Sequence, residues 1–191
     1  MAVAVAVDSS ELHRISSAKY HEFIEAGVLV DARVELIDGL ICDMSPRTPE
    51  HERIVAHLNR LLANRLDSTY VLRVASALTI GGSEPEPDLA VIALDTPEPY
   101  HPSTAAVVIE VALSSLRRDL TVKPRVYASA GVKEYWVIDI EHSSVMVQRN
   151  PATDEYGSRL ELGRRDLLDG SVVGVDPIPV ADIFTAAQPA R

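Results

Sequence analysis

Two stretches decide the fold of this 191-residue chain: Glu84-Pro-Glu-Pro-Asp-Leu-Ala-Val-Ile92 and Val107-Val-Ile-Glu-Val111. Each joins strand-forming apolar residues to one carboxylate, Asp88 in the first and Glu110 in the second. The second belongs to an apolar run over 105–112, which is typical of a central strand buried on both faces. Two such strands place both carboxylates at defined points of a sheet, where they can share one hard cation.

The first half of the chain is predicted to supply two helices, a hairpin and a strand. Ser16 or Ser17 can cap a helix running to about Ala26, with Gly27 ending it. Asp38-Gly39 suits a tight turn between two strands. The other elements are the strands of that hairpin over 34–37 and 40–44, a helix from Thr48 or Pro49 with an apolar stripe to Leu66, and a strand over 70–80.

The second half continues the alternation of helices and strands, so we predict an α/β fold with a mixed sheet and helices against it. A helix is predicted over 121–130, where Gly131 ends it. The strands expected after it lie over 134–140, 144–149 and 171–175, and a last ordered segment covers 178–184.

Length and composition predict one domain in a reducing compartment. A chain of this length buries roughly 70% of the surface that its unfolded form would expose. We assign residues 17–184 to the domain, 1–16 to a flexible N-terminus and 185–191 to a tail. No apolar run approaches the roughly 20 residues of a membrane span, and Met1–Val7 lacks the basic region of a secretory signal. Cys42 is the only cysteine, so we expect a cytoplasmic protein without an internal disulfide.

The net charge of -10 argues against an unspecific nucleic-acid binder that relies on charge alone. A local basic patch formed by Arg117, Arg118, Lys123 and Arg125 can still meet a phosphate backbone. The same patch is equally well interpreted as the solvated start of a helix.

Glu110 is the residue hardest to explain without a function, because an ionised carboxylate in an apolar strand is costly unless it is paired or bound to a metal. A purely structural interpretation pairs it with Arg118 or Lys123, and both interpretations stay open. Asp88 alone is weaker evidence, since aspartate is common where a turn becomes a strand. Its value lies in its pairing with Glu110.

Together these residues have the chemistry of a magnesium site. Mg²⁺ commonly takes one or two protein carboxylates and keeps several waters, which Asp88 and Glu110 can satisfy. Lys123 can orient a metal-bound water or stabilise charge on a phosphate. Glu35 is either a third ligand or a solvent-facing hairpin residue, and His51 either touches a phosphate, braces a carboxylate or is an exposed residue at a helix start.

Other chemistries lack their motifs in this sequence. We find no phosphate-binding Gly-x-x-x-x-Gly-Lys loop, no Gly-x-Ser-x-Gly elbow and no His-Glu-x-x-His. His51, His57 and Cys42 lack the spacing of a zinc site, which argues against zinc bound by them.

Several motifs together resemble the bacterial Uma-two family over about 17–184. They are Val-Glu-Leu-Ile-Asp-Gly at 34–39, His51, Pro87-Asp88, Glu110-Val111 with Ser114, Lys123, Tyr127, Ala-Gly-Val at 130–132 and Glu-Tyr-Trp-Val-Ile-Asp at 134–139. The resemblance implies a restriction-endonuclease-like fold of the PD-(D/E)XK superfamily. It also implies a site built from Glu35, Asp88 and Glu110, with Lys123 supplied by the following helix.

Two positions depart from the superfamily pattern. The usual lysine lies two residues after the second acid, but Ala112 stands there, so Lys123 must substitute for it. Pro124 follows that lysine and is best tolerated in the first turn of a helix. A helix that begins near Thr121 or Val122 accommodates both residues, whereas one that begins at Asp119 would be kinked and could misplace the lysine.

Our sequence-based hypothesis is a DNA endonuclease that uses Mg²⁺ or Mn²⁺. Asp88 and Glu110 hold the metal, Glu35 supports it and Lys123 assists the attacking water. Tyr127 braces the lysine or contacts the nucleic acid, and His51 and Arg118 bind substrate. The alternatives are a non-catalytic module that binds nucleic acid or protein, and a hydrolase of small phosphorylated molecules. We also expect a homodimer, with 144–149 as an edge strand available for pairing.

Overall fold

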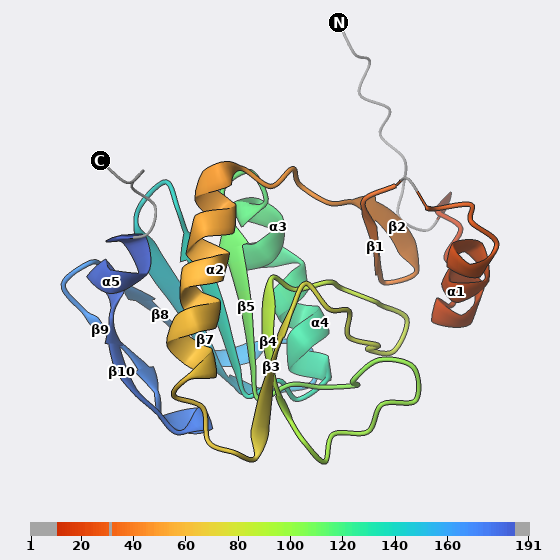
Figure 1. Cartoon of the computed structure of the whole chain (residues 1–191). Coiled ribbons are helices and arrows are strands. Elements are labelled where there is room, and N and C mark those ends of the chain that lie inside the picture. The colour runs from red at the N-terminus through yellow and green to blue at the C-terminus, as the bar shows by residue number, and fades with distance from the viewer. Residues whose placement is uncertain (1–10, 31, 186–191) are drawn as a thin grey trace, which may run out of the picture.

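A six-stranded mixed sheet forms the centre of the computed structural model, which describes residues 11–30 and 32–185 (Figure 1). Most of the expected flexible N-terminus, and the tail from residue 186, lie outside the described residues. The strand order is β3-β4-β5-β6-β7-β8, and only β5 and β6 pair in parallel. The strands are β3 Tyr70–Val74, β4 Leu89–Ala93, β5 Val107–Ala112, β6 Glu134–Asp139, β7 Ser144–Pro151 and β8 Tyr156–Leu162.

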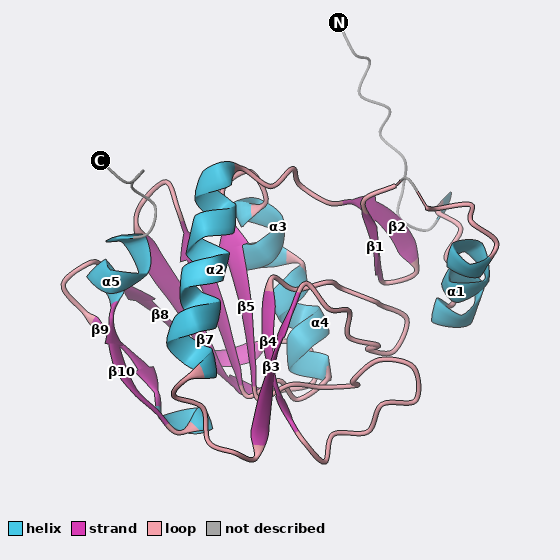
Figure 2. Ribbon diagram, viewed as in Figure 1, coloured by secondary structure: helices cyan, strands magenta, loops and turns pink. Residues whose placement is uncertain are grey.

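Helices cover both faces of this sheet, as Figure 2 shows. On one face α2, Pro49–Ala63, buries Ile54, Leu58 and Leu62 against the sheet. On the other face lie two short helices, α3 Leu116–Thr121 and α4 Lys123–Ser129. The observed layers confirm the predicted α/β fold with a mixed sheet flanked by helices.

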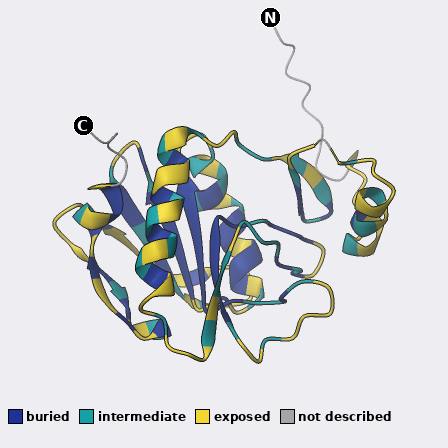
Figure 3. Cartoon of the chain, in the orientation of Figure 1, coloured by how far each residue is buried: buried dark blue, intermediate teal, exposed yellow. Residues whose placement is uncertain are grey.

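The C-terminal residues extend the layer on the α2 side. They form β9 Leu167–Gly170, a 3-10 turn over Ser171–Val173, β10 Val175–Pro179 and α5 Val180–Thr185. Ile183 and Phe184 of α5 join the same buried cluster as the inward face of α2. Figure 3 shows the result, with buried central strands beneath an α2 that exposes only its outer face.

The N-terminal helix and hairpin lie to one side of the sheet (Figure 1). The helix is α1, Ser17–Glu25, where Ser16 Oγ accepts a hydrogen bond from the Lys19 N–H, as a cap should. The hairpin is β1 Val34–Ile37 and β2 Leu40–Asp43, joined by Asp38 and Gly39, both with positive φ. Leu36 and Glu84 exchange backbone hydrogen bonds, which fix the hairpin against the segment before β4.

Two predicted strands were wrong in their extent. The strand predicted over 70–80 ends at Val74, because Ala75 takes a φ of 46° and turns the chain out of the sheet. Beyond it the chain turns toward the segment before β4, where the Leu78 N–H bonds the Pro85 carbonyl. The strand predicted over 171–175 is instead a 3-10 turn, with β10 beginning only at Val175 after the left-handed Gly174.

Three further differences concern the second half of the chain. β7 pairs with β6 on one side and β8 on the other, so the prediction that 144–149 is an edge strand was wrong. Strands β8 and β9 were not predicted at all. The helix predicted over 121–130 is α4, and α3 precedes it with a break at Val122.

Candidate active site

Glu110 lies on β5 and Asp88 lies directly before β4, the strand next to it, so the two carboxylates are neighbours in the sheet as the sequence predicted. β4 pairs antiparallel with β5, with Leu89 opposite Ile109. Asp88 precedes β4 by one residue, and its Oδ2 accepts a hydrogen bond of 2.9 Å from the Val111 N–H of β5. The two carboxyl groups are therefore held on the same face of the paired strands β4 and β5, where both residues are buried.

Lys123 lies among these carboxylates and is only 4% exposed. Its Nζ is 2.8 Å from Glu110 Oε1 and 3.1 Å from Glu35 Oε2. Because the helix is interrupted at Val122, Lys123 and Pro124 lie in the first turn of α4, where a proline costs no helical hydrogen bond. The lysine thus reaches the site although a helix precedes it.

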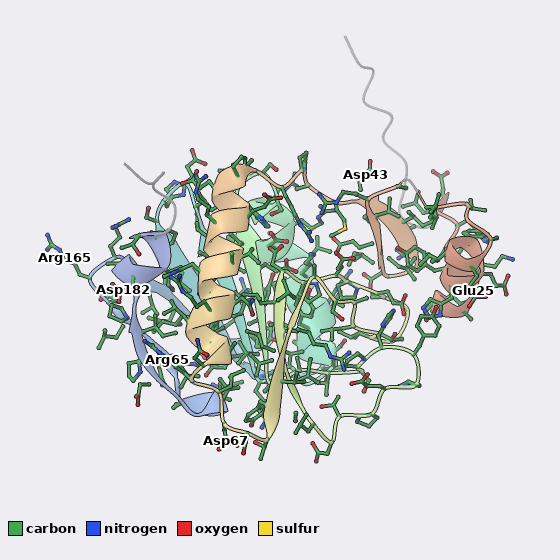
Figure 4. All side chains as sticks on the ribbon, viewed as in Figure 1. Glu25, Asp43, Arg65, Asp67, Arg165 and Asp182 are labelled. Atoms are coloured by element: carbon green, nitrogen blue, oxygen red, sulfur yellow. The ribbon has the colours of Figure 1, made fainter. Side chains whose placement is uncertain are left out.

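Glu35 reaches the site from β1 and is 1% exposed, so it is not a solvent-facing hairpin residue. Its Oε2 accepts a long hydrogen bond from the Glu86 N–H at 3.4 Å. Arg118 Nη1 lies 3.8 Å from Glu35 Oε1 and donates to the Asp43 carbonyl at 2.7 Å. Asp43 is the last residue of β2 (Figure 4). Arg118 therefore links the hairpin to α3 beside the carboxylates.

Asp119 is a fourth carboxylate at this site, and the sequence analysis missed it. It is 1% exposed, and its Oδ1 lies 3.7 Å from Lys123 Nζ. Within the described residues this oxygen has no hydrogen-bond partner. The signal that could have revealed it is its spacing of four residues before Lys123, which brings two side chains together on a helix-like turn.

His51 and Tyr127 contact the carboxylates directly. His51 Nε2 is 3.0 Å from Asp88 Oδ2, and its backbone N–H is capped by Thr48 Oγ1 at the start of α2. The fully buried Tyr127 donates its hydroxyl hydrogen to Glu110 Oε1 at 2.8 Å, and so braces that carboxylate rather than the lysine. Both residues hold an acid of the site in place.

The electrostatics of the site show a shortage of positive charge. Burial raises the pKa of Glu110 to about 8. Lys123 acts to lower this pKa, whereas the nearby acids Asp119, Asp88 and Glu35 raise it further. Burial alone would lower the pKa of Lys123, but its carboxylate neighbours outweigh that effect and raise it. Burial also raises the pKa of the Asp119 carboxyl. The acids exceed the cations available to them, so a further cation would be stabilised here.

These groups line a cleft with a free volume of about 50 Å³. Glu35, Asp88, Glu110, Asp119 and Lys123 contribute to its lining, as do His51 and Arg118. Arg33 and Arg47 are also part of its lining. The cleft therefore combines a buried acidic interior with arginines suited to an anionic ligand.

Comparisons with known proteins agree with this architecture. A profile of the Uma2 (Uma-two) family, described as "Putative restriction endonuclease", matches residues 18–176. Among solved structures, the chain is similar to a putative nuclease belonging to DUF820 from Anabaena variabilis, with a TM-score of 0.63 and 18% identity over 81% of this chain and 91% of that one. That likeness establishes a restriction-endonuclease-like fold.

A second structural match is the type IIG restriction endonuclease BpuSI, with a TM-score of 0.42 and 17% identity. It involves 76% of this chain but spans only 17% of that longer protein. No match was found among curated proteins. In the part of the chain that is described, no helix has the length and apolar character needed to cross a membrane.

Proposed function

We propose that this chain, which belongs to the Uma2 family described as "Putative restriction endonuclease", is a metal-dependent endonuclease that hydrolyses phosphodiester bonds in DNA. Family and fold indicate a nuclease of the restriction-endonuclease type. The observation that carries the proposal is the cluster of buried carboxylates around Lys123 in a cleft lined with arginines. Burying several like charges is costly for stability, which favours a functional role for this cluster.

The donor set fits Mg²⁺ or Mn²⁺. Carboxylate oxygens are the ligands that these ions prefer, and the buried Asp119 Oδ1 has no hydrogen-bond partner among the described residues. We assign Asp88 and Glu110 as ligands, supported by Glu35. A bound divalent ion supplies a more acidic water and stabilises charge on the scissile phosphate.

The other side chains position these groups and the substrate. Lys123 orients the attacking water and offers positive charge to the phosphate, while Tyr127 and His51 hold Glu110 and Asp88 in place. His51 Nδ1 is buried with no hydrogen-bond partner among the described residues, so the partner it can take is an enclosed water. Arg118 and Arg47 line the cleft and are assigned to phosphate contacts.

The test is cleavage of supercoiled and single-stranded DNA with Mg²⁺, Mn²⁺ or chelator. Asp88→Asn and Glu110→Gln keep the side-chain volume and remove the charge of each proposed ligand. Glu134→Gln is the matched control, because Glu134 is also a buried strand glutamate but is paired with Arg149 outside the cleft. We expect cleavage that needs metal, falls at least a hundredfold in the two site variants and persists in the control.

One observation favours a non-catalytic function. Lys123 already pairs with both Glu110 and Glu35, so these carboxylates can be retained as a structural ion-pair network. A folded protein that binds DNA by fluorescence anisotropy but cuts none of these substrates would support this alternative. Equal cleavage by wild type and both site variants would refute the assigned ligands.

The proposed enzyme is expected to act as a homodimer, since cutting both strands of a duplex is most simply done with two sites. Strands β3 and β8 are the sheet edges, so pairing between copies would use one of these instead of β7. Sedimentation velocity with and without duplex DNA tests this expectation.

A further inference from the structure

A second cluster of potential metal ligands lies away from the acidic cleft and plays no part in the proposed hydrolysis. It consists of His21 on α1, Glu84 before β4 and His101 in the loop between β4 and β5. One donor atom from each residue lies within 4.8 Å of the other two. These three residues, here called the histidine cluster, come from segments far apart in the sequence.

Glu84 is the fixed centre of the histidine cluster. It is 3% exposed, and its backbone pairs with Leu36 of the hairpin in both directions. Its Oε1 accepts a hydrogen bond of 2.6 Å from Thr79 Oγ1. A ligating carboxylate is commonly held in this way by a hydrogen bond from outside the metal shell.

The two imidazoles are also held in place. Tyr100 stacks on the His21 ring at a centroid distance of 3.6 Å and meets the His101 ring edge-on at 4.8 Å. The loop is anchored one residue beyond His101, where the Pro102 carbonyl accepts from the Thr79 N–H. Thr79 therefore positions both the carboxylate and the loop that carries His101.

An ion pair between His21 and Glu84 does not account for this arrangement. His21 Nε2 lies 2.6 Å from Glu84 Oε1, which satisfies those two residues. His101 nevertheless lies within ligand reach of both, and its ring makes no hydrogen bond to any described residue. The third nitrogen donor gives this carboxylate one more potential metal ligand beside it than a His–Glu ion pair requires.

We propose that the histidine cluster binds one Zn²⁺ ion. Two imidazole nitrogens and one carboxylate oxygen form a known zinc set, with water as the fourth ligand. Bonds of about 2.0–2.1 Å in a tetrahedron separate ligand atoms by about 3.3 Å. To reach that spacing the His21–Glu84 contact of 2.6 Å would open by less than about 1 Å, and donor atoms as far as 4.8 Å apart would close by about 1.5 Å. Imidazole ligands also favour zinc over magnesium.

The zinc ion would act as a clamp in the structure. It joins α1 and the β4–β5 loop to the segment 84–88, whose other end supplies Asp88 to the cleft. This inference does not depend on the proposed nuclease activity, because zinc binding and DNA cleavage are measured separately.

The test is a zinc titration of chelator-treated, dialysed full-length protein against a competing chromophoric chelator. His101→Ala and His21→Ala each remove one proposed ligand. His142→Ala is the matched control, because His142 also pairs with a carboxylate, Asp139, at 2.8 Å but belongs to no group of three potential ligands among the described residues. We expect one saturable site in wild type and in the control, and at least tenfold weaker zinc binding in the other two variants.

Histidine side-chain NMR of the wild-type protein provides a test that needs no variant. Zinc should shift the ring nitrogens of His21 and His101 and leave those of His142 unchanged. The proposal is overturned if wild type has no saturable zinc site, if folded His101→Ala binds zinc as wild type does, or if zinc shifts His51 of the acidic cleft instead.

Discussion

The segment 84–88 has a cluster that attracts cations at each end, and the two clusters differ in chemistry and in construction. At Asp88 the partners are carboxylates and an internal lysine, held by the central sheet and by α4. At Glu84 the partners are two half-buried imidazoles, held by α1 and a loop. The first is suited to a hard ion such as Mg²⁺ and the second to zinc.

Because the two clusters are built differently, they should contribute differently to the stability of the fold. The acidic site carries its own buried cation, Lys123, which offsets part of the charge of the surrounding carboxylates. The histidine cluster consists of two half-buried imidazoles and one buried carboxylate, Glu84, which already contacts His21. Damage to the first should therefore destabilise the whole domain, and damage to the second should loosen only α1 and its neighbours.

Lys123→Met should have the largest effect. It removes the cation from among buried carboxylates and should lower the free energy of unfolding by about 3–5 kcal/mol, besides abolishing DNA cleavage. Urea denaturation measures the loss, and adding Glu110→Gln should restore part of it by removing one unpaired charge. A loss below about 1 kcal/mol would mean that the lysine and carboxylates are not coupled as described.

The pH dependence of stability should come next in size. Burial raises the pKa of Glu110 from 4.5 to about 8, so between those values the folded protein binds more protons than the unfolded chain. The free energy of unfolding of metal-free protein should therefore fall as pH rises from about 5 to 8, by at most about 1.4 kcal/mol per unit from this group. Urea denaturation across this range should show a shallower fall for Glu110→Gln, and equal slopes would contradict the prediction.

Glu84→Gln should have a smaller and local effect. The amide oxygen can still accept from Thr79, but the charge facing His21 is lost, at a cost of about 1–2 kcal/mol. Hydrogen exchange should accelerate about tenfold in α1 while β5 is unaffected. Acceleration spread evenly over the sheet would show that the histidine cluster supports the whole domain.

Arg118→Lys should have the smallest effect on stability, within about 1 kcal/mol, because the charge is kept and only the hydrogen bond to the Asp43 carbonyl is weakened. If Arg118 contacts phosphate, the DNA affinity of the variant measured by fluorescence anisotropy should fall a few-fold, and its turnover number should stay unchanged. A fall in turnover with unchanged DNA affinity would instead mean that Arg118 acts by positioning the Glu35 carboxylate.

Local patterns predicted the elements best where one residue type imposes the structure. Asp38-Gly39 gave the hairpin turn, Thr48 the start of α2, and the apolar run before and after Glu110 the central strand. The prediction failed where the chain departs from its local pattern. Ala75 takes a left-handed conformation that no sequence rule assigns to alanine, and the weakly patterned β8 is defined by its pairing with β7.

The sequence by itself determined the family and the fold, and it predicted that Glu35, Asp88, Glu110 and Lys123 share one site, because ordered motifs and charged residues in apolar strands are local signals. Only the tertiary structure decided that Tyr127 braces Glu110, that Asp119 joins the acids, and that His21, Glu84 and His101 meet. The physical reason is that these contacts depend on where α1, α3 and the β4–β5 loop pack. No spacing along the chain specifies those positions.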